Sequence, residues 1–203
     1  TSHASIQAIT LSEGDAGNIA LHADNLSITK ESFVAASGLF GTGGASGNVD
    51  IAAKEIFISG LEISDDPFGI DFTGISTVSG YDGGKGGDIH IHAGDIYVTN
   101  RGLISANSLG SDKGGNIEIS TKKIELLEGA TITAGGYGSG DGGLIQIDAD
   151  KIVVSGVHPQ PYQDKISNEE ALSVSAIGSQ AGFNGGIGGD VIIKAIDLEI
   201  MNG

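Results

Sequence analysis

The sequence predicts an all-β chain that folds as a right-handed parallel β-helix, a three-sheet solenoid of about six coils. Three observations predict it. A glycine stands before a short run of alternating apolar residues six times along the chain. A second apolar pair follows each of these glycines at one fixed distance. Glycine-rich segments then come once per unit and not after every strand, which argues against an antiparallel sandwich.

The first strand of each unit follows an anchor glycine. The anchors are Gly17, Gly47, Gly87, Gly115, Gly143 and Gly189. The runs after them are NIALHA, NVDIAA, DIHIHA, NIEIST, LIQIDA and DVIIKA. Apolar residues alternate in each run, and a period of two is typical of a strand with one buried face. The pattern therefore predicts that residues such as Ile117 and Ile119 point into a core.

A second and a third strand complete each unit. Nine residues after the anchors stand Leu26, Ile56, Ile96, Ile124, Ile152 and Leu198, and another aliphatic residue follows each of them two positions on. The third strand is expected at Val34, Ile75, Ile104, Ile132 and Val174. The basic unit is then 28 residues. Two units carry insertions of 11 and 14 residues, at about 60–74 and 156–171.

Units of three short strands bury their apolar faces only by stacking. Each strand is expected to pair in parallel with its counterpart one coil away, about 4.8 Å distant, so that six coils span roughly 29 Å. Parallel crossovers favour a right-handed coil. Glycine is expected to supply positive φ angles in the loops. The whole chain, residues 1–203, is interpreted as one solenoid segment, and its opening in mid-repeat predicts a fragment of a longer chain.

Composition narrows the classes of partner. The net charge is −16, with only 10 lysine and arginine residues against 26 acidic ones, so the chain is not expected to bind nucleic acid. No apolar run reaches the 18 residues of a membrane-spanning helix. The absence of cysteine excludes disulfides. The acidity is typical of a rod that must stay soluble.

The repeat GGNIEIxxxxIxLxxGAxITAxxxGxGxGG, read from residues 114–143, resembles those of filamentous-haemagglutinin-type exoproteins, the large adhesins exported by two-partner secretion. The resemblance covers essentially the whole chain. It implies a long β-helical protein, secreted or held at the bacterial cell surface, and an outer-membrane transporter as its export partner. As a signal of function it is weak, since such repeats mainly build a shaft.

Two segments resemble part of a calcium-binding nonapeptide repeat. GGKGGD ends at Asp88 and GGIGGD ends at Asp190. Such sites need copies nine residues apart, because successive turns share each ion. These copies are 102 residues apart. We therefore expect both aspartates to stand in a polar column at the strand start, with Asn18, Asn48 and Asn116.

A metal site is considered at the sequence HIHA. His90 and His92 lie on one outward face of a strand, with Glu118 expected beside His90 one coil away. Imidazole and carboxylate groups so placed could hold a surface zinc ion. The alternative is a solvated patch of complementary charges, which we favour. No cofactor is expected.

The two insertions are the preferred place for binding, because loops on a rigid scaffold often carry recognition. The candidate residues are Asp65, Asp66 and Phe68 in the first insertion and His158, Tyr162 and Gln163 in the second. They are expected to contact a surface glycan or a protein of a host or neighbouring cell. The alternative is that their aromatic residues fold back as local caps.

These observations favour a non-enzymatic shaft segment of a secreted or cell-surface adhesin-like exoprotein. No nucleophile motif is present, and no acid–base group accompanies the single arginine, Arg101. One alternative is a surface protein that binds or cleaves polysaccharide. A second is a purely structural spacer or sheath protein. In each case, open strand edges at the ends predict a tendency to stack end to end.

Overall fold

The computed structural model describes residues 4–38, 44–60, 73–81, 84–159, 162–163, 170–171, 173–182 and 186–201. This described part is all β and contains no helix. Its strands are β1 (Ser5–Gln7), β2 (Ile19–Thr29), β3 (Phe33–Ala35), β4 (Val49–Ser59), β5 (Gly74–Ser76), β6 (Ile89–Thr99), β7 (Leu103–Ser105), β8 (Ile117–Leu127), β9 (Thr131–Thr133), β10 (Ile145–Ser155), β11 (Tyr162–Gln163), β12 (Glu170–Ala171), β13 (Ala176–Gly178) and β14 (Val191–Met201).

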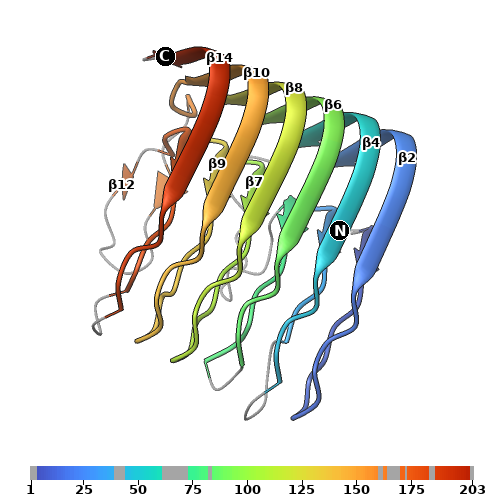
Figure 1. Cartoon of the computed structure of the whole chain (residues 1–203), viewed down its shortest axis with the longest axis vertical. Helices are drawn as coiled ribbons and strands as arrows, with labels where there is room; N and C mark the ends of the chain where they lie inside the picture. Colours follow the sequence, from blue (N-terminus) through green and yellow to red (C-terminus); the bar gives the residue numbers. More distant parts are fainter. Residues whose placement is uncertain are drawn as a thin grey trace.

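Among the described residues, two parallel sheets of six strands each dominate the fold. The long sheet has the order β14-β10-β8-β6-β4-β2, and the short sheet has the order β1-β3-β5-β7-β9-β13. Each strand lies beside its counterpart from the next coil, so the coils stack in sequence order (Figure 1). Ile117 pairs with Ile89 and with Ile145, each 28 residues away. The arrangement is consistent with the predicted parallel β-solenoid.

The predicted first and second strands of each coil form one continuous strand of 11 residues. The inward alternation nevertheless shifts by one residue at its middle. In β8, Ile117, Ile119 and Thr121 are buried, and the next buried residues are Ile124 and Leu126. The pairing register with β10 has a gap at the same point, since residue 122 is not paired. Each long strand thus consists of two half-strands that meet at an interruption of the pairing.

The predicted third strand of the fifth coil is wrong by three residues. Ile177, not Val174, pairs with Ile132 in the short sheet. Val174 instead forms an antiparallel bridge with Val157 and is 54% exposed. Residues 156–175 connect β10 to β13, whereas residues 128–130 connect β8 to β9. The segment VSAI offers two apolar residues that fit a third strand, so the apolar pattern alone could not choose between them.

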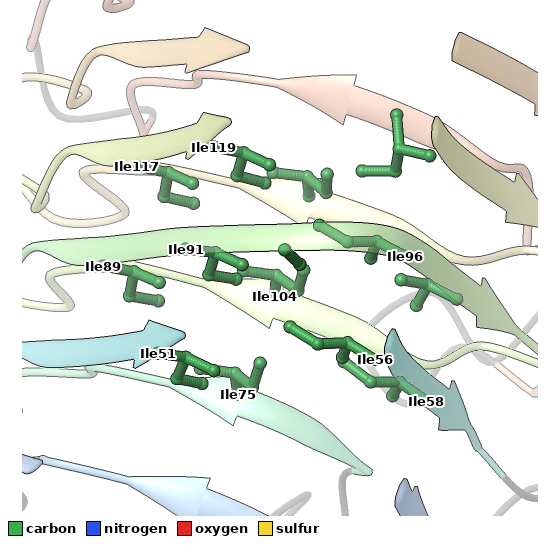
Figure 2. Close-up of a cluster of buried hydrophobic side chains, with 14 of the residues drawn as sticks. Ile51, Ile56, Ile58, Ile75, Ile89, Ile91, Ile96, Ile104, Ile117 and Ile119 are labelled. Atoms are coloured by element: carbon green, nitrogen blue, oxygen red, sulfur yellow. The ribbon is translucent and has the colours of Figure 1, made fainter. Parts of the chain in front are cut away.

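Aliphatic side chains fill the space between the two sheets (Figure 2). Ile75 and Ile104 of the short sheet lie opposite residues such as Ile56 and Ile96 of the long sheet, and all four are fully buried. The columns continue into β14. There Ile200 is 76% exposed, because no described strand packs over the inner face of β14. The core is therefore continuous through the coils and open at one end.

The anchor glycines are required by close backbone contact. A Cβ atom on Gly143 would collide with the carbonyl oxygen of Gly115, and Gly115 stands in the same relation to Gly87. The expectation that glycine supplies positive φ angles in the connecting loops is confirmed at Gly129 and Gly156, in the turns after β8 and β10. In the described residues, positive φ also occurs at Gly74 and at five non-glycine residues of the turns, Lys30, Glu31, Asn100, Arg101 and Glu128. Loop glycines serve mainly to let neighbouring coils approach.

Candidate binding surfaces

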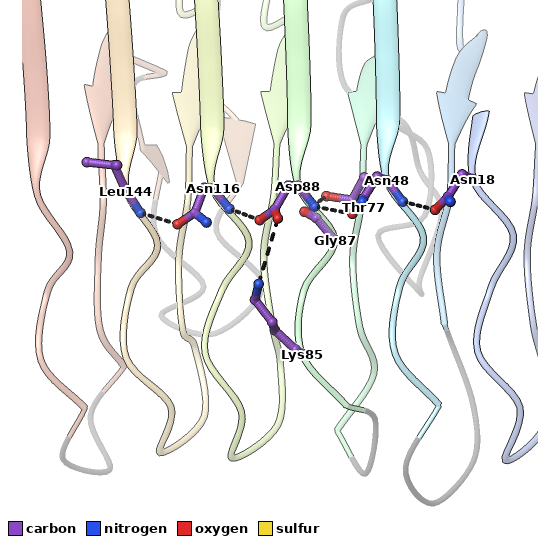
Figure 3. A network of polar contacts seen from close by, with 8 residues as sticks. All are labelled: Asn18, Asn48, Thr77, Lys85, Gly87, Asp88, Asn116 and Leu144. Atoms are coloured by element: carbon purple, nitrogen blue, oxygen red, sulfur yellow. Dashed lines mark hydrogen bonds and ion pairs between the residues drawn. The ribbon is translucent and has the colours of Figure 1, made fainter. Parts of the chain in front are cut away.

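A ladder of side-chain acceptors runs along the start of the long strands (Figure 3). Oδ1 of Asn18 accepts a hydrogen bond from the backbone amide of Asn48, at 2.8 Å. Oδ1 of Asn48 accepts from the backbone amide of Asp88, at 2.9 Å, and Oδ1 of Asp88 accepts from the backbone amide of Asn116, at 2.7 Å. Asn116 accepts from the amide of Leu144, at 3.0 Å. Each residue thereby satisfies one backbone donor of the next coil.

This ladder accounts for the motif that resembles a calcium repeat. Oδ1 of Asp88 is used by the next coil, and Nζ of Lys85 lies 3.7 Å from its Oδ2. The predicted polar column is confirmed for Asp88 and the three asparagines. The ladder ends at Leu144, whose side chain has no acceptor to offer Asp190. Asp190 itself is exposed.

The second insertion contains a small antiparallel hairpin. Strands β11 and β12 pair Tyr162 with Ala171, and Val157 bridges to Val174 nearer the solenoid. The positions of Tyr162 and Gln163 thus lie on a two-stranded arm, and only their backbone is described. The candidates Asp65, Asp66 and Phe68 of the first insertion lie outside the described residues.

His158 lies at the base of this hairpin and is only 3% exposed. Its backbone amide donates to the carbonyl oxygen of Ser173, at 2.8 Å. Nε of Arg101 donates to Oγ of Ser173, also at 2.8 Å, so the turn after β6, two coils earlier, is attached to the same point. A buried imidazole is not offered to a ligand from solution. We therefore interpret His158 as part of the attachment of the arm.

An open groove crosses the outer face of the long sheet. Its volume is about 460 Å³. It is lined by His22 of β2, Asp50, Ile51 and Ala52 of β4, His90, Ile91 and His92 of β6, Glu118, Ile119 and Ser120 of β8, and Gln146 and Asp148 of β10. The lining combines imidazoles and carboxylates and includes no lysine or arginine among the described residues. The groove is therefore suited to a cation or to a ligand rich in hydrogen-bonding groups.

A short polar contact in the groove joins Asp50 and His90. These residues are register partners on β4 and β6, and Nδ1 of His90 lies 2.8 Å from Oδ1 of Asp50. Glu118 is the register partner of His90 on its other side. The sequence interpretation named His90, His92 and Glu118 but missed His22, Gln146 and Asp148. Extending the same outward columns by one or two coils would have found them.

In the described residues, no group of three or more histidine, aspartate or glutamate side chains is arranged to hold a metal ion. His90, His92 and Glu118 are thus near one another without forming a preformed three-ligand set. Nor does any helix in the described part have the length and apolar character needed to cross a membrane.

Comparisons with known proteins add no family assignment. The chain matches no protein-family model, no curated protein and no solved structure. The resemblance to haemagglutinin-type repeats therefore remains a prediction from the sequence.

Proposed function

We propose that this chain is a non-enzymatic shaft segment of a secreted or cell-surface adhesin-like exoprotein. The observation that carries the proposal is the continuity of its repeating contacts. The apolar columns and the glycine contacts pass from coil to coil, and the acceptor ladder joins five coils before it ends. Stacked units that contact only their neighbours build a stiff, extendable rod. Such a rod is suited to holding a binding element away from a surface.

We infer a right-handed coil with three faces. The two half-strands of each long strand would form two of them, because the inward alternation shifts between the halves. The short sheet would form the third. The preference of parallel crossovers for the right-handed sense supports the handedness.

Recognition would reside in the two insertions. Both follow a long strand, at about residues 60–74 and 156–171, and therefore leave the same edge of the solenoid. The paired arm of β11 and β12 supports this proposal for the second insertion. The partner would be a surface glycan or a protein of a host or neighbouring cell. Export through an outer-membrane transporter rests on the sequence resemblance alone.

The first experiment is antibody labelling of intact cells that naturally produce the protein. Antibodies raised against residues 1–203 should label the cell surface, and brief protease treatment of the intact cells should remove the label. Antibodies against a cytosolic protein serve as the control for cell integrity. Antigen that is found only after the cells are opened would contradict the exoprotein proposal.

A second candidate function, polysaccharide binding or cleavage, is favoured by the groove. The Asp50–His90 pair beside Glu118 places a possible acid–base group on an open sheet face. The test is incubation with neutral and acidic linear polysaccharides, followed by an assay for new reducing ends and unsaturated products. Cleavage that is lost in Glu118→Gln would favour this candidate over the shaft. A protein with neither cleavage nor saturable binding would be a structural spacer.

A further inference from the structure

His90 and His92 lie two residues apart on β6. Alternate residues of a strand point to the same face, so both imidazoles lie on the outer face of the long sheet. Both line the groove. The side chain of His90 is 43% exposed, and His92 is also exposed. Two imidazoles therefore reach solvent side by side from one rigid, doubly paired strand.

Asp50 fixes the orientation of the His90 ring. The 2.8 Å contact joins Oδ1 of Asp50 to Nδ1 of His90, so in the neutral ring the proton lies on Nδ1 and is donated to the carboxylate. Nε2 then keeps its lone pair free. Histidines that bind metals typically donate their other ring nitrogen to a carboxylate in this way.

The surroundings of His92 leave room for an ion. Its register partners are Ala52 and Ser120, whose side chains are short. No described residue hydrogen-bonds to its ring. Asp148 lies beyond Ser120 in the same outward column, and Glu118 lies beside His90. Carboxylates around the imidazoles favour a cation, and imidazole with carboxylate is a donor set that suits zinc.

We propose that His90 and His92 together bind one divalent zinc ion at the surface of the long sheet. Nε2 of His90 and one ring nitrogen of His92 are the protein ligands, and Asp50 is a positioning residue for His90. Because the described residues hold no set of three ligands, water or an external oxygen donor fills the other positions. The site is therefore exchangeable and open, unlike a closed structural zinc site.

The test is isothermal titration of metal-stripped chain 1–203 with zinc chloride. We expect saturable binding of one ion per chain. His92→Ala should weaken binding at least tenfold, because one of two protein ligands is lost. Asp50→Asn should weaken it about tenfold, as is usual for a carboxylate behind a metal-bound histidine. His22→Ala is the matched control, since His22 lines the same groove two strands away from His92. It should change the affinity less than twofold.

A nitrogen-correlated NMR spectrum of the histidine rings tests the role of Asp50 separately. It should show the Nδ1–H form of His90 in the parent chain and a mixture of tautomers in Asp50→Asn. A circular dichroism spectrum confirms that each variant is folded. The proposal is wrong if the double variant His90→Ala/His92→Ala binds zinc as the parent does. It is also wrong if His22→Ala weakens binding as much as His92→Ala.

Discussion

The carbonyl oxygen of Gly115 occupies the space that a Cβ atom on residue 143 would need. The same relation joins Gly47 to Gly17, Gly87 to Gly47, Gly115 to Gly87 and Gly189 to Gly143. At this point of each coil, backbone stacks directly on backbone. The spacing of the coils there depends on the absence of a side chain, which explains the glycine before every first strand except that at Gly17, where a Cβ atom would meet only the side chain of Ala8 at 3.6 Å.

Gly143→Ala should therefore destabilise the chain strongly. The added methyl group cannot be accommodated without moving two coils apart, and overpacking of this kind costs about 1–3 kcal/mol and occasionally more. The measurement is the free energy of unfolding from a urea titration. Gly14→Ala is the matched control, because a Cβ atom there meets nothing within 4 Å. A similar loss in both variants would show that the backbone contact is not the cause.

The acceptor ladder gives a second prediction. Asn116→Ala removes the acceptor for the amide of Leu144 and should lower the free energy of unfolding by about 1–2 kcal/mol. Asn116→Asp keeps an oxygen at that place, as Asp88 does one coil earlier, and should lose clearly less. Urea titrations of the two variants compare them directly. The ladder has no energetic role if alanine and aspartate behave alike.

Much of this fold could be predicted because the repeat gives the same information six times. The long-strand core positions recur at fixed distances from an anchor glycine, so residues such as Ile117 and Ile124 were assigned to the core correctly. The fifth coil has no such regularity between β10 and β13. There the choice between Val174 and Ile177 depends on how the insertion folds, which alternation does not reveal.

The groove was only partly predictable for a different reason. Its residues come from five strands, and each is an ordinary outward polar residue in its own strand. Only stacking in register makes them neighbours. Counting columns predicts that Asp50 adjoins His90, but the hydrogen bond between Oδ1 and Nδ1 depends on side-chain rotamers. Similarly, the burial of His158 depends on how the second insertion folds, which the local sequence does not reveal.

The core columns predict a position-dependent cost of truncation. Ile58 is fully buried, whereas Ile200 occupies the same column in β14 and is 76% exposed. Ile58→Ala should cost about 2–5 kcal/mol through lost burial and a cavity. Ile200→Ala should change stability by less than about 1 kcal/mol, since little of its surface is removed from water. Urea midpoints of the two variants measure the difference, and equal midpoints would contradict the open end of the core.

Tyr137 gives a prediction about alkaline pH. Its ring lies against Gly135 and the residue is 43% exposed, and the burial of the remainder raises the pKa of its phenol above the ordinary value of 10.0. The folded state thus favours the protonated phenol. This contribution to stability is present below the unfolded pKa and is lost as pH rises through the folded pKa.

A phenolate absorbance titration should show one of the four tyrosines ionising at a higher pH than the others. Tyr137→Phe should remove this late component and reduce the loss of stability above about pH 10. Tyr81→Phe is the control, because Tyr81 is 78% exposed. A late component that survives in Tyr137→Phe would assign it to another residue.

The open face of β14 leads to the last prediction, that the isolated 203-residue chain associates end to end. One edge of β14 pairs with β10, no described strand pairs with its other edge, and Leu198 and Ile200 are exposed beside that edge. β2 of a second copy presents the counterpart edge, and such a head-to-tail contact does not close on itself. Sedimentation velocity should therefore show species whose sedimentation coefficient rises with protein concentration.

Leu198→Lys/Ile200→Lys should abolish these larger species, because the contact would then bury charged side chains. Ile187→Lys, which changes an exposed loop residue, should leave them unchanged. A chain that stays monomeric at every concentration, or that responds equally to both changes, does not stack through β14.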